Sequence, residues 1–484
     1  MKKKGNLYEL IYSLDKAERK HFLVNSHRIR NSKYMRLFEF IVNNNHVDDE
    51  CVRGYFRGER FLNQLHVVKN YLYNRILDSL RENHSAATIN IRIKNHIISA
   101  EVLFKKELYH QCYYELKKAK NLASKFERTI DLLEILKMEK ALIQSPLTDK
   151  GNLPAISNII SEEHQQIRSM SIYNQYLDIS YNVLSDGYQP SSSSEILKSK
   201  ILERNIDNDP LLTKIMHHHI AYVFHTFQGN TEEGINQIRQ LTEVIESHPH
   251  RIADDPKPYI TAINNQIGAL LYLRKHTEIQ DLLIKIRQIP DKYKLPLDSY
   301  LRRSLARSYN MELELYRDTL EIDKGLDLIP KTIGFLEDNI DLLPEEYIIN
   351  LYYQFAYLNF LAGNHATALQ FTNEIIGRNF GAIREDMQGF ARLLNLILHY
   401  ELKNIIVLKY AVLSTRRFLQ KKKEMHLYEQ NLLKFCSRLC TTPIADHRRL
   451  FGEAKETVFK HTKPSELDSI LDYLDFNRWF SMHD

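Results

Sequence analysis

The stretch YLNFLAGNHATALQF, residues 357–371, consists of two apolar runs that are separated by Gly363. Aromatic and aliphatic residues recur at helical spacing on both sides of the glycine. Glycine suits the end of a helix because the residue after the last turn often adopts a left-handed backbone, which side chains with a Cβ resist. The stretch therefore predicts two helices joined by a tight turn, with Ala356 and Ala368 at their closest approach.

Other parts of the chain follow the same plan with different residues. Apolar helical runs meet at Glu107-Leu108-Tyr109, Gly229-Asn230, Arg274-Lys275-His276 and Lys403-Asn404. The turns at 229, 274, 363 and 403 lie 45, 89 and 40 residues apart, which is one or two units of about 40–45 residues. A single helix pair would leave an apolar side uncovered, so we expect the pairs to stack on one another.

The region around Gly363 resembles the tetratricopeptide-repeat (TPR) family. The matching positions are Tyr352, Phe355, Ala356, Phe360, Gly363, His365, Ala368 and Phe371, with histidine where tyrosine is usual. The repeat spacing is longer than the family's usual length of about 34 residues. The resemblance implies an all-α fold, a TPR-like α-solenoid of antiparallel helix pairs, whose first helices line a concave binding surface. The chain as a whole also resembles large helical-repeat proteins of Bacteroidetes.

The composition supports helices over most of the chain. Its 484 residues include only 15 glycines and 13 prolines, the residues that interrupt helices most strongly. We predict a basic helical module over residues 1–84, the TPR-like array over 88–462, and a C-terminal capping helix over 463–484. No apolar run is long enough to cross a membrane, and four cysteines suggest no disulfide framework, so a cytoplasmic location is expected.

The N-terminal module carries 16 Lys and Arg against 10 Asp and Glu, while the whole chain has a net charge of +5. Three helices are predicted in it, over residues 33–44, 47–56 and 60–82. A long third helix after an arginine-rich join is typical of helix-turn-helix readers of DNA. Candidate nucleic-acid contacts are Arg53, Arg57, Arg60, Lys69 and Arg81. The alternative is a helical cap that begins the array, with its arginines in solvent.

No enzyme signature is present in the sequence. It contains no GxGxxG, GxxxxGK[ST] or GxSxG motif. The histidines of residues 214–227 lack the spacing of a metal site, and Cys436 and Cys440 lie four apart rather than in a CxxC pair. We therefore predict no catalytic, cofactor or metal site, with these histidines on a helix face and these thiols in the core.

The leading functional hypothesis is a non-enzymatic scaffold that binds a protein or peptide on the concave surface of the array. By analogy with TPR-like arrays, first-helix residues would line that surface. The candidates are Tyr222, Asn264, Arg303, Arg307, Gln354 and Asn359. The alternative hypothesis is a DNA-binding transcriptional regulator, in which the N-terminal module reads DNA and the repeats sense a partner.

Overall fold

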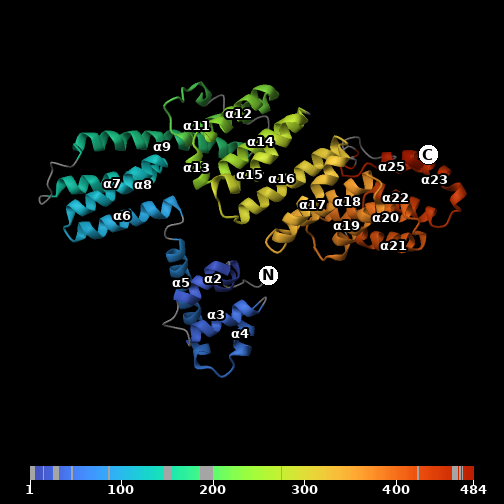
Figure 1. Ribbon diagram of the computed structural model, residues 1–484, viewed down its shortest axis with the longest axis horizontal. Coiled ribbons are helices and arrows are strands. Elements are labelled where there is room, and N and C mark those ends of the chain that lie inside the picture. Colours follow the sequence, from blue (N-terminus) through green and yellow to red (C-terminus); the bar gives the residue numbers. More distant parts are fainter. Residues whose placement is uncertain are drawn as a thin grey trace. The chain divides into compact units, whose positions relative to one another are not determined.

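Figure 1 shows the computed structural model of the full chain. The structure describes residues 6–14, 16–25, 32–44, 47–84, 88–145, 154–185, 200–273, 275–421, 425–459, 467, 470 and 473–483. Within these residues every regular element is a helix, and none is a strand. The all-α part of the predicted fold class is thus confirmed. The chain divides into two compact units, residues 1–228 and 229–484, which are described in turn.

The first 84 residues have an apolar core of their own. Their elements are α1 (Asn6–Ser13), α2 (Lys16–Asn25), α3 (Lys33–Asn43), α4 (Asp49–Tyr55), the 3-10 helix η2 (Arg60–Gln64) and α5 (Leu65–His84). The core residues come from all of them and include Ile11, Phe38 and Leu72, which are almost fully buried. The prediction of three helices here was incomplete, because α1 and α2 also pack on α5.

The rest of the first unit is a succession of helices that pack on their neighbours in the chain. They are α6 (Ile89–Lys105), α7 (Tyr109–Lys125), α8 (Thr129–Gln144), α9 (Ile156–Ser185), the 3-10 helix η4 (Ile201–Glu203) and α11 (Leu211–Phe227). Charged pairs cross between these helices as well. Lys120 of α7, for example, lies 2.9 Å from Glu139 of α8 and 2.9 Å from Glu162 of α9.

The second unit continues with helices that pack in the same sequential manner. They are α12 (Thr231–Glu246), α13 (Pro249–Asp254), α14 (Lys257–Tyr272), η5 (His276–Glu278), α15 (Ile279–Tyr293), α16 (Ser299–Asp318), α17 (Ile322–Asn339), α18 (Glu345–Leu361), α19 (His365–Gly377), α20 (Glu385–Glu401), α21 (Ile405–Gln420), α22 (Leu427–Leu439), η6 (Ile444–Asp446), α23 (His447–Thr457) and α25 (Phe476–His483).

One kind of turn joins many of these helices. Gly363 has a φ of 78°, which confirms the predicted left-handed turn, and the next amide, Asn364 N–H, donates to the Asn359 carbonyl at 2.9 Å. A hydrogen bond from an amide to the carbonyl five residues earlier is typical of helix C-termini that end in a left-handed residue. In the same way, the amides of residues 108, 128, 275 and 404 donate to the carbonyls of residues 103, 123, 270 and 399. A residue with positive φ, here called the turn residue, precedes the donating amide at Glu107, Glu127, Gly363 and Lys403. Gly229 and Leu320 also have a positive φ just before α12 and α17 and are counted as turn residues as well.

The helices that follow these turns bury residues in a common register. The fifth, ninth and twelfth residues after each turn residue are buried. They are Cys112, Leu116 and Ala119 in α7; Leu132, Leu136 and Glu139 in α8; Gly234, Ile238 and Leu241 in α12; Gly325, Ile329 and Thr332 in α17; Ala368, Thr372 and Ile375 in α19; and Leu408, Val412 and Thr415 in α21. The fifth position is often small.

Small residues at the fifth position allow neighbouring helices to approach closely. Ala356 of α18 and Ala368 of α19 are both fully buried in one cluster, as the sequence predicts for a close approach. At Gly325 of α17, a Cβ would lie 2.9 Å from Cδ2 of Leu358 in α18. Any larger side chain at these places would push into the neighbouring helix, because protein interiors are close-packed.

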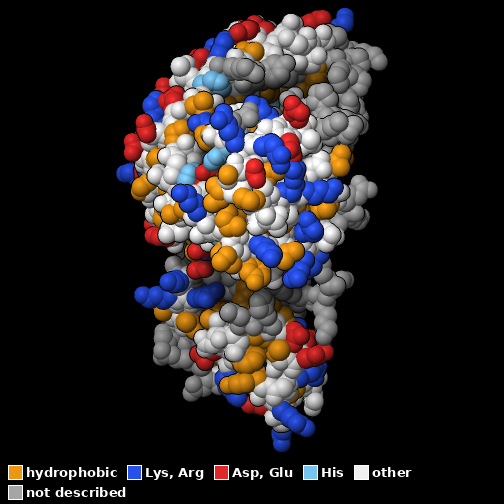
Figure 2. Space-filling view, turned by 90° about the vertical axis from the view of Figure 1, so that its right-hand side faces the viewer, with side chains coloured by type: hydrophobic (Ala, Val, Ile, Leu, Met, Phe, Trp, Pro, Cys, Tyr) orange, Lys and Arg blue, Asp and Glu red, His pale blue; other side chains and the backbone are white. Residues whose placement is uncertain are grey.

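The C-terminal residues 473–483 pack on α18 and α20. Tyr353 donates its hydroxyl proton to the carbonyl of Tyr473 at 2.8 Å, and the amide of Asp475 donates to the Tyr357 hydroxyl at 2.8 Å. Trp479 is buried, as is Leu474. The predicted boundary at residues 462–463 lies outside the described residues, as does the one at 85–87. Figure 2 looks onto the C-terminal end of this unit, where hydrophobic side chains lie among Lys and Arg.

Candidate functional site: a polar pocket on α16, α18 and α20

A polar pocket of about 450 Å³ lies on three helices of the second unit. Helix α16 contributes Asn310, Glu314 and Arg317, which are spaced by four and three residues and therefore share one helical face. The remaining lining residues are Asn350 and Gln354 of α18, Arg384 and Met387 at the start of α20, and Tyr473 of the C-terminal segment. Amides and guanidinium groups thus dominate the pocket.

Helix α18 presents this pocket on the side opposite to its packing partner α19. Phe355 and Tyr352 place their rings 5.3 and 6.3 Å from the ring of Phe371 in α19. At 100° per residue, Asn350 and Gln354 lie on the other side of the α18 axis from these aromatic residues. The helix is therefore apolar towards α19 and polar towards the pocket.

Arg317 is the most buried charged residue of the pocket, with its side chain 7% exposed. Its guanidinium forms ion pairs with Asp318 at 2.8 Å and Glu314 at 3.5 Å, and donates to the Gln354 amide oxygen at 3.4 Å. Burial alone would lower the pKa of Arg317, but the charges of Asp318 and Glu314 outweigh it and raise that pKa. The cation is thus held in place as a fixed feature of the pocket wall.

Arg384 is the second cation of the pocket. It donates to both carboxylate oxygens of Asp386, at 3.0 and 2.8 Å, and to the amide oxygen of Asn350 at 2.8 Å. The hydrogen bonds to Asp386 raise the pKa of Arg384 although burial opposes this. Because Arg384 and Arg317 occupy the amide oxygens of Asn350 and Gln354, the amide nitrogens of these two residues remain as donors.

The pocket has hydrogen-bonding capacity that the described residues do not use. The Oδ1 atom of Asn310 is buried and accepts no hydrogen bond from them. Among the same residues, no acceptor is found for the amide nitrogens of Asn350 and Gln354. Unused buried polar groups are costly, and they commonly pair with water or with a ligand. One acceptor beside two donors is complementary to the N–H and C=O groups of a peptide backbone.

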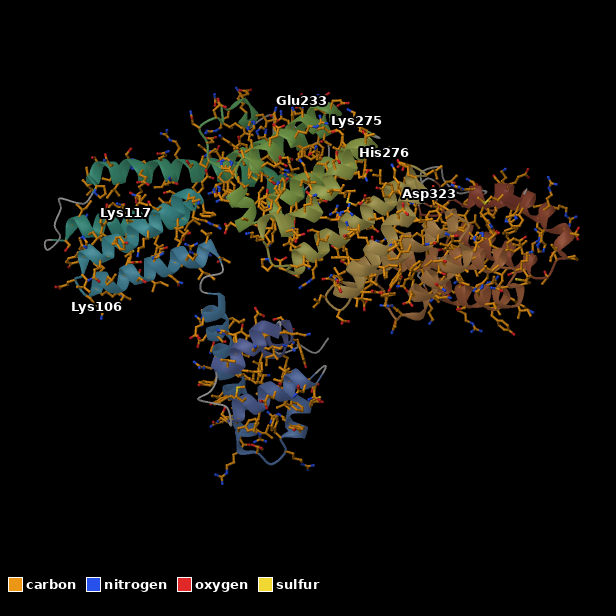
Figure 3. All side chains as sticks on the ribbon, in the orientation of Figure 1. Lys106, Lys117, Glu233, Lys275, His276 and Asp323 are labelled. Atoms are coloured by element: carbon orange, nitrogen blue, oxygen red, sulfur yellow. The ribbon has the colours of Figure 1, made fainter. Side chains whose placement is uncertain are left out.

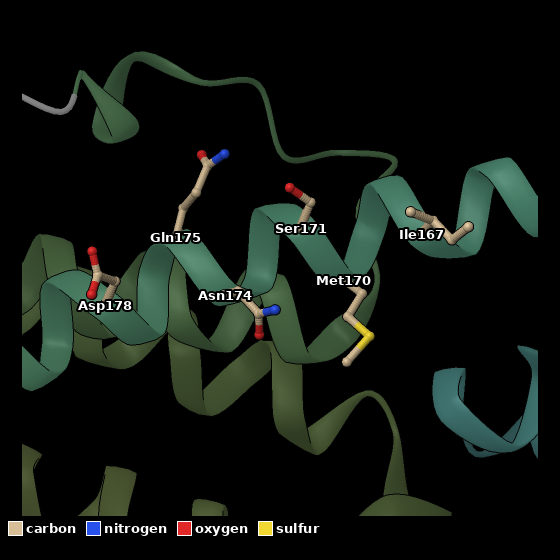
Figure 4. A pocket seen from close by; sticks show the side chains of 6 residues that line it. All are labelled: Ile167, Met170, Ser171, Asn174, Gln175 and Asp178. Atoms are coloured by element: carbon tan, nitrogen blue, oxygen red, sulfur yellow. The ribbon is translucent and has the colours of Figure 1, made fainter.

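Two other hollows lie on the described residues. One, of about 640 Å³, is lined in the described region only by residues of α9: Ile167, Met170, Ser171, Asn174, Gln175 and Asp178. Figure 4 shows that Ser171 and Gln175 point to one side of the helix and Met170 and Asn174 to the other, so their polar groups do not converge. A smaller hollow, of about 300 Å³, contains Glu246, whose carboxylate already accepts from Tyr259 and Lys285.

The structure places the six predicted partner-binding residues in different surroundings. Gln354 alone lines the pocket. Asn359 is buried, and its amide donates to the carbonyl of Phe355 in its own helix at 2.8 Å. Arg303 is half-buried and Arg307 exposed on α16, and Asn264 is half-buried on α14. Tyr222 is half-buried on α11 of the first unit. Their binding roles stay predictions.

Sequence reasoning missed most of the pocket. The spacing of Asn310, Glu314 and Arg317 could have indicated that these three polar residues share one face of a helix. Nothing in the sequence signals that Arg384, which precedes α20, and Tyr473, which lies 89 residues later, meet at that face. Their convergence follows only from how α16, α18 and α20 pack.

The five predicted nucleic-acid contacts also differ in surroundings. Lys69 pairs with Asp49 at 2.6 Å and lies over the Tyr8 ring, and Arg81 pairs with Asp78 at 2.5 Å. Arg53 donates to the Leu62 carbonyl at 3.5 Å. Arg57 and Arg60 are exposed. The outward face of α5 instead carries Val67, Asn70, Tyr71, Asn74 and Arg75, all exposed.

The histidines and cysteines form no metal-binding group of three or more among the described residues, with Asp and Glu included in the search. His217 accepts from, or donates to, the Tyr176 hydroxyl at 2.8 Å, and burial lowers the pKa of His217 to about 4. That low pKa makes the ring neutral at pH 7, so the direction of this hydrogen bond depends on which ring nitrogen carries the proton. Cys436 is buried as predicted, whereas Cys440 is only half-buried.

The described part of the chain is thus all-helical, and its second unit carries a polar pocket. The chain matches no family model, and no curated protein or solved structure shows significant similarity to it. In the part of the chain that the structure describes, no helix has the length and hydrophobicity needed to cross a membrane.

Proposed function

We propose that this protein is a non-enzymatic scaffold whose helix pairs form a TPR-like solenoid and whose α16–α18–α20 pocket binds an extended peptide segment. The solenoid interpretation is supported by the recurrent turn, its backbone bond spanning five residues, and the shared register of buried residues after each turn residue. In such an array each unit buries its apolar face on its neighbours.

A single observation carries the binding proposal: the pocket holds an unused buried acceptor on Asn310 next to unused amide donors on Asn350 and Gln354. An extended peptide offers alternating N–H and C=O groups, which could satisfy this set irrespective of side chains. Arg317 and Arg384 lie in the same wall, so a segment with a nearby carboxylate would gain a charge-assisted bond. We propose binding rather than catalysis, because the two arginines are held by neighbouring carboxylates.

Selection from a randomised displayed-peptide library on the full-length protein would test this proposal. Peptides that bind the wild type should bind Asn310→Ala and Asn350→Ala at least about tenfold more weakly, which corresponds to about 1.4 kcal/mol. The control is Gln370→Ala, an exposed amide on α19 away from the pocket, which should bind as the wild type does. Selected peptides that are indifferent to both pocket variants would argue against this site.

A second candidate function is DNA binding by the N-terminal module. The observation that favours it is the outward face of α5, where Asn70, Asn74 and Arg75 are exposed. No Asp or Glu occurs between Glu59 and Asp78. Asparagine and arginine are the side chains that pair with adenine and guanine edges in the major groove, and Arg57 and Arg60 could contact phosphates.

Titration of the full-length protein with a labelled DNA duplex at several salt concentrations would test this second candidate. Arg57→Ala with Arg60→Ala should reduce the slope of log affinity against log salt by about two, one for each lost phosphate contact. Arg81→Ala should change it little, because Arg81 is paired with Asp78. Binding that is weak and independent of salt would exclude DNA as the ligand.

A further inference from the structure

Helix α21 has an unusual outward face. Four large apolar side chains on it are exposed, Ile406 by 78% and Tyr410 by 68%, with Val407 and Leu413 beside them. The opposite side of the helix is buried through Leu408, Val412 and Leu419. At 100° per residue, Ile406, Tyr410 and Leu413 form a stripe along about two turns. The helix therefore presents one apolar stripe to its own core and another to solvent.

The other helices that follow a turn residue show that the fold does not require this second stripe. Ile406, Val407, Tyr410 and Leu413 are the third, fourth, seventh and tenth residues after the turn residue Lys403. The equivalent residues are His110, Gln111, Tyr114 and Lys117 in α7; Ile130, Asp131, Glu134 and Lys137 in α8; Glu232, Glu233, Asn236 and Arg239 in α12; Asp323, Lys324, Asp327 and Pro330 in α17; and Ala366, Thr367, Gln370 and Asn373 in α19.

These equivalent positions are mostly charged or polar, as expected for solvated helix faces, and all are exposed apart from the buried Asp131 and the half-buried Glu134 and Arg239. Figure 3 labels three of them, Lys117, Glu233 and Asp323, on their helices. Only in α21, among these six helices, are all four residues large and apolar. The register of buried residues is the same in all six, so the difference lies in what the outward face meets.

The charge around the stripe has one sign. No Asp or Glu occurs between Glu401 and Glu424, whereas this stretch contains seven Lys and Arg. Lys403, Lys409, Arg417 and Lys421 are exposed on or beside the face. An apolar stripe with cations along its sides complements a helix that has its own apolar stripe and acidic flanks.

We propose that the outward face of α21 docks an acidic amphipathic helix of another protein. This surface is separate from the pocket of the proposed function, so the two could fail or succeed independently. Ile406, Tyr410 and Leu413 would pack against the partner's apolar residues at the spacing of two facing helices. Lys403, Lys409 and Arg417 would face the partner's carboxylates. A stripe only two turns long fits a short partner helix. Helices that bind a lipid surface usually bury a longer apolar face in it.

The probe for the test is a fluorescein-labelled peptide of about four helical turns, with leucines on one face and glutamates on both flanks. Its binding to the full-length protein would be measured by fluorescence anisotropy. The matched variant carries the α19 residues on α21: Ile406→Ala, Val407→Thr, Tyr410→Gln and Leu413→Asn. We expect this variant to bind at least about tenfold more weakly. Its melting temperature should be unchanged, because the replaced side chains are exposed.

Two further measurements distinguish an acidic helix from other occupants of this face. A peptide with glutamine in place of glutamate should bind more weakly, and added salt should reduce only the glutamate peptide's affinity. The proposal is overturned if the α19-like variant binds the glutamate peptide as the wild type does. It is likewise overturned if the glutamate peptide does not bind, while phosphatidylglycerol vesicles bind the wild type but not the α19-like variant. Dissociation of a dimer by the four substitutions would assign the face to a second copy of the chain instead.

Discussion

The indole N–H of Trp479 donates to the Glu401 carboxylate at 2.6 Å, across 78 residues of sequence. The same oxygen lies 2.7 Å from Nε2 of His483, so one carboxylate at the end of α20 holds two residues of α25. Burial by itself would raise the pKa of Glu401, but the bonds from His483 and Trp479 outweigh it and lower that pKa. The C-terminal helix is therefore attached to α20 by an ionised glutamate.

Because the folded-state pKa of Glu401 is depressed, its contribution to stability is present above the ordinary value of 4.5 and is lost as the pH falls through the lower folded-state value. Glu401→Gln should cost roughly 1.5–3 kcal/mol at pH 7, the range of a hydrogen bond to a charged group, and less at pH 3, below the ordinary pKa of the carboxyl. Trp479 is the only tryptophan, so its fluorescence would report the loosening of α25. Glu374→Gln, at an exposed pair with Arg378, serves as the control and should show no such pH dependence. An equal loss at both pH values would contradict this account.

Ala368 should tolerate no larger side chain. It is fully buried in the cluster that also holds Ala356, so Ala368→Leu forces methylenes into a filled contact and should cost about 1–3 kcal/mol. Thr367→Leu, at the exposed neighbouring position, should cost much less. Denaturant unfolding would measure both changes.

The damage from Ala368→Leu should stay local if the helix pairs form a solenoid, because each unit then contacts only its neighbours. Amide hydrogen exchange should accelerate over residues 345–400 and remain unchanged over residues 90–145. Equal acceleration in both regions would argue against stacked repeats.

Leu320 should be replaceable by glycine with a gain in stability. Its φ of 58° is left-handed, and its side chain is 60% exposed, so little packing compensates for the strain. A left-handed residue with a Cβ costs roughly 1–2 kcal/mol, from which the greater unfolded-state entropy of glycine must be subtracted. We expect Leu320→Gly to stabilise the protein by about 0.5–1 kcal/mol in thermal unfolding. Leu320→Ala keeps the Cβ and should not stabilise; a gain as large as that of glycine would show that backbone strain is not the cause.

The cysteines should differ sharply in reactivity. Cys51 is exposed, whereas Cys112 and Cys436 are buried; burial raises the pKa of Cys112 to about 11 and that of Cys436 further. The thiolate is the reactive form, so at pH 8 a thiol reagent should modify Cys51 rapidly and Cys112 and Cys436 only after unfolding. Cys51→Ser should remove the fast phase. Rapid labelling of Cys112 in the native protein would show that α7 opens readily.

Local features of the fold could be predicted from the sequence because they depend on neighbouring residues. The helices on both sides of Gly363 follow from apolar residues at helical spacing, and the left-handed turn follows from glycine itself. The equivalent turns at Glu107 and Lys403 were found as breaks in the apolar pattern, but their positive φ was not foreseen, since glutamate and lysine carry no signal for it. Helices α1 and α2 were missed as well. Helix α2 is mostly polar and buries little beyond Phe22, so its periodicity is weak.

The sequence by itself determined that the chain is helical and where many helices end, because few prolines and glycines interrupt long apolar periodicities. Only the tertiary structure decided which polar residues meet. Gln354 was predicted as a contact on α18, but Arg317, Asn350, Arg384 and Tyr473 reach the same pocket because three helices and the C-terminal segment pack side by side. It likewise decided that Asn359, five residues from Gln354, turns into the core. Helical periodicity assigns residues to faces, but which face is covered depends on long-range packing, and that information is distributed over residues far apart in the chain.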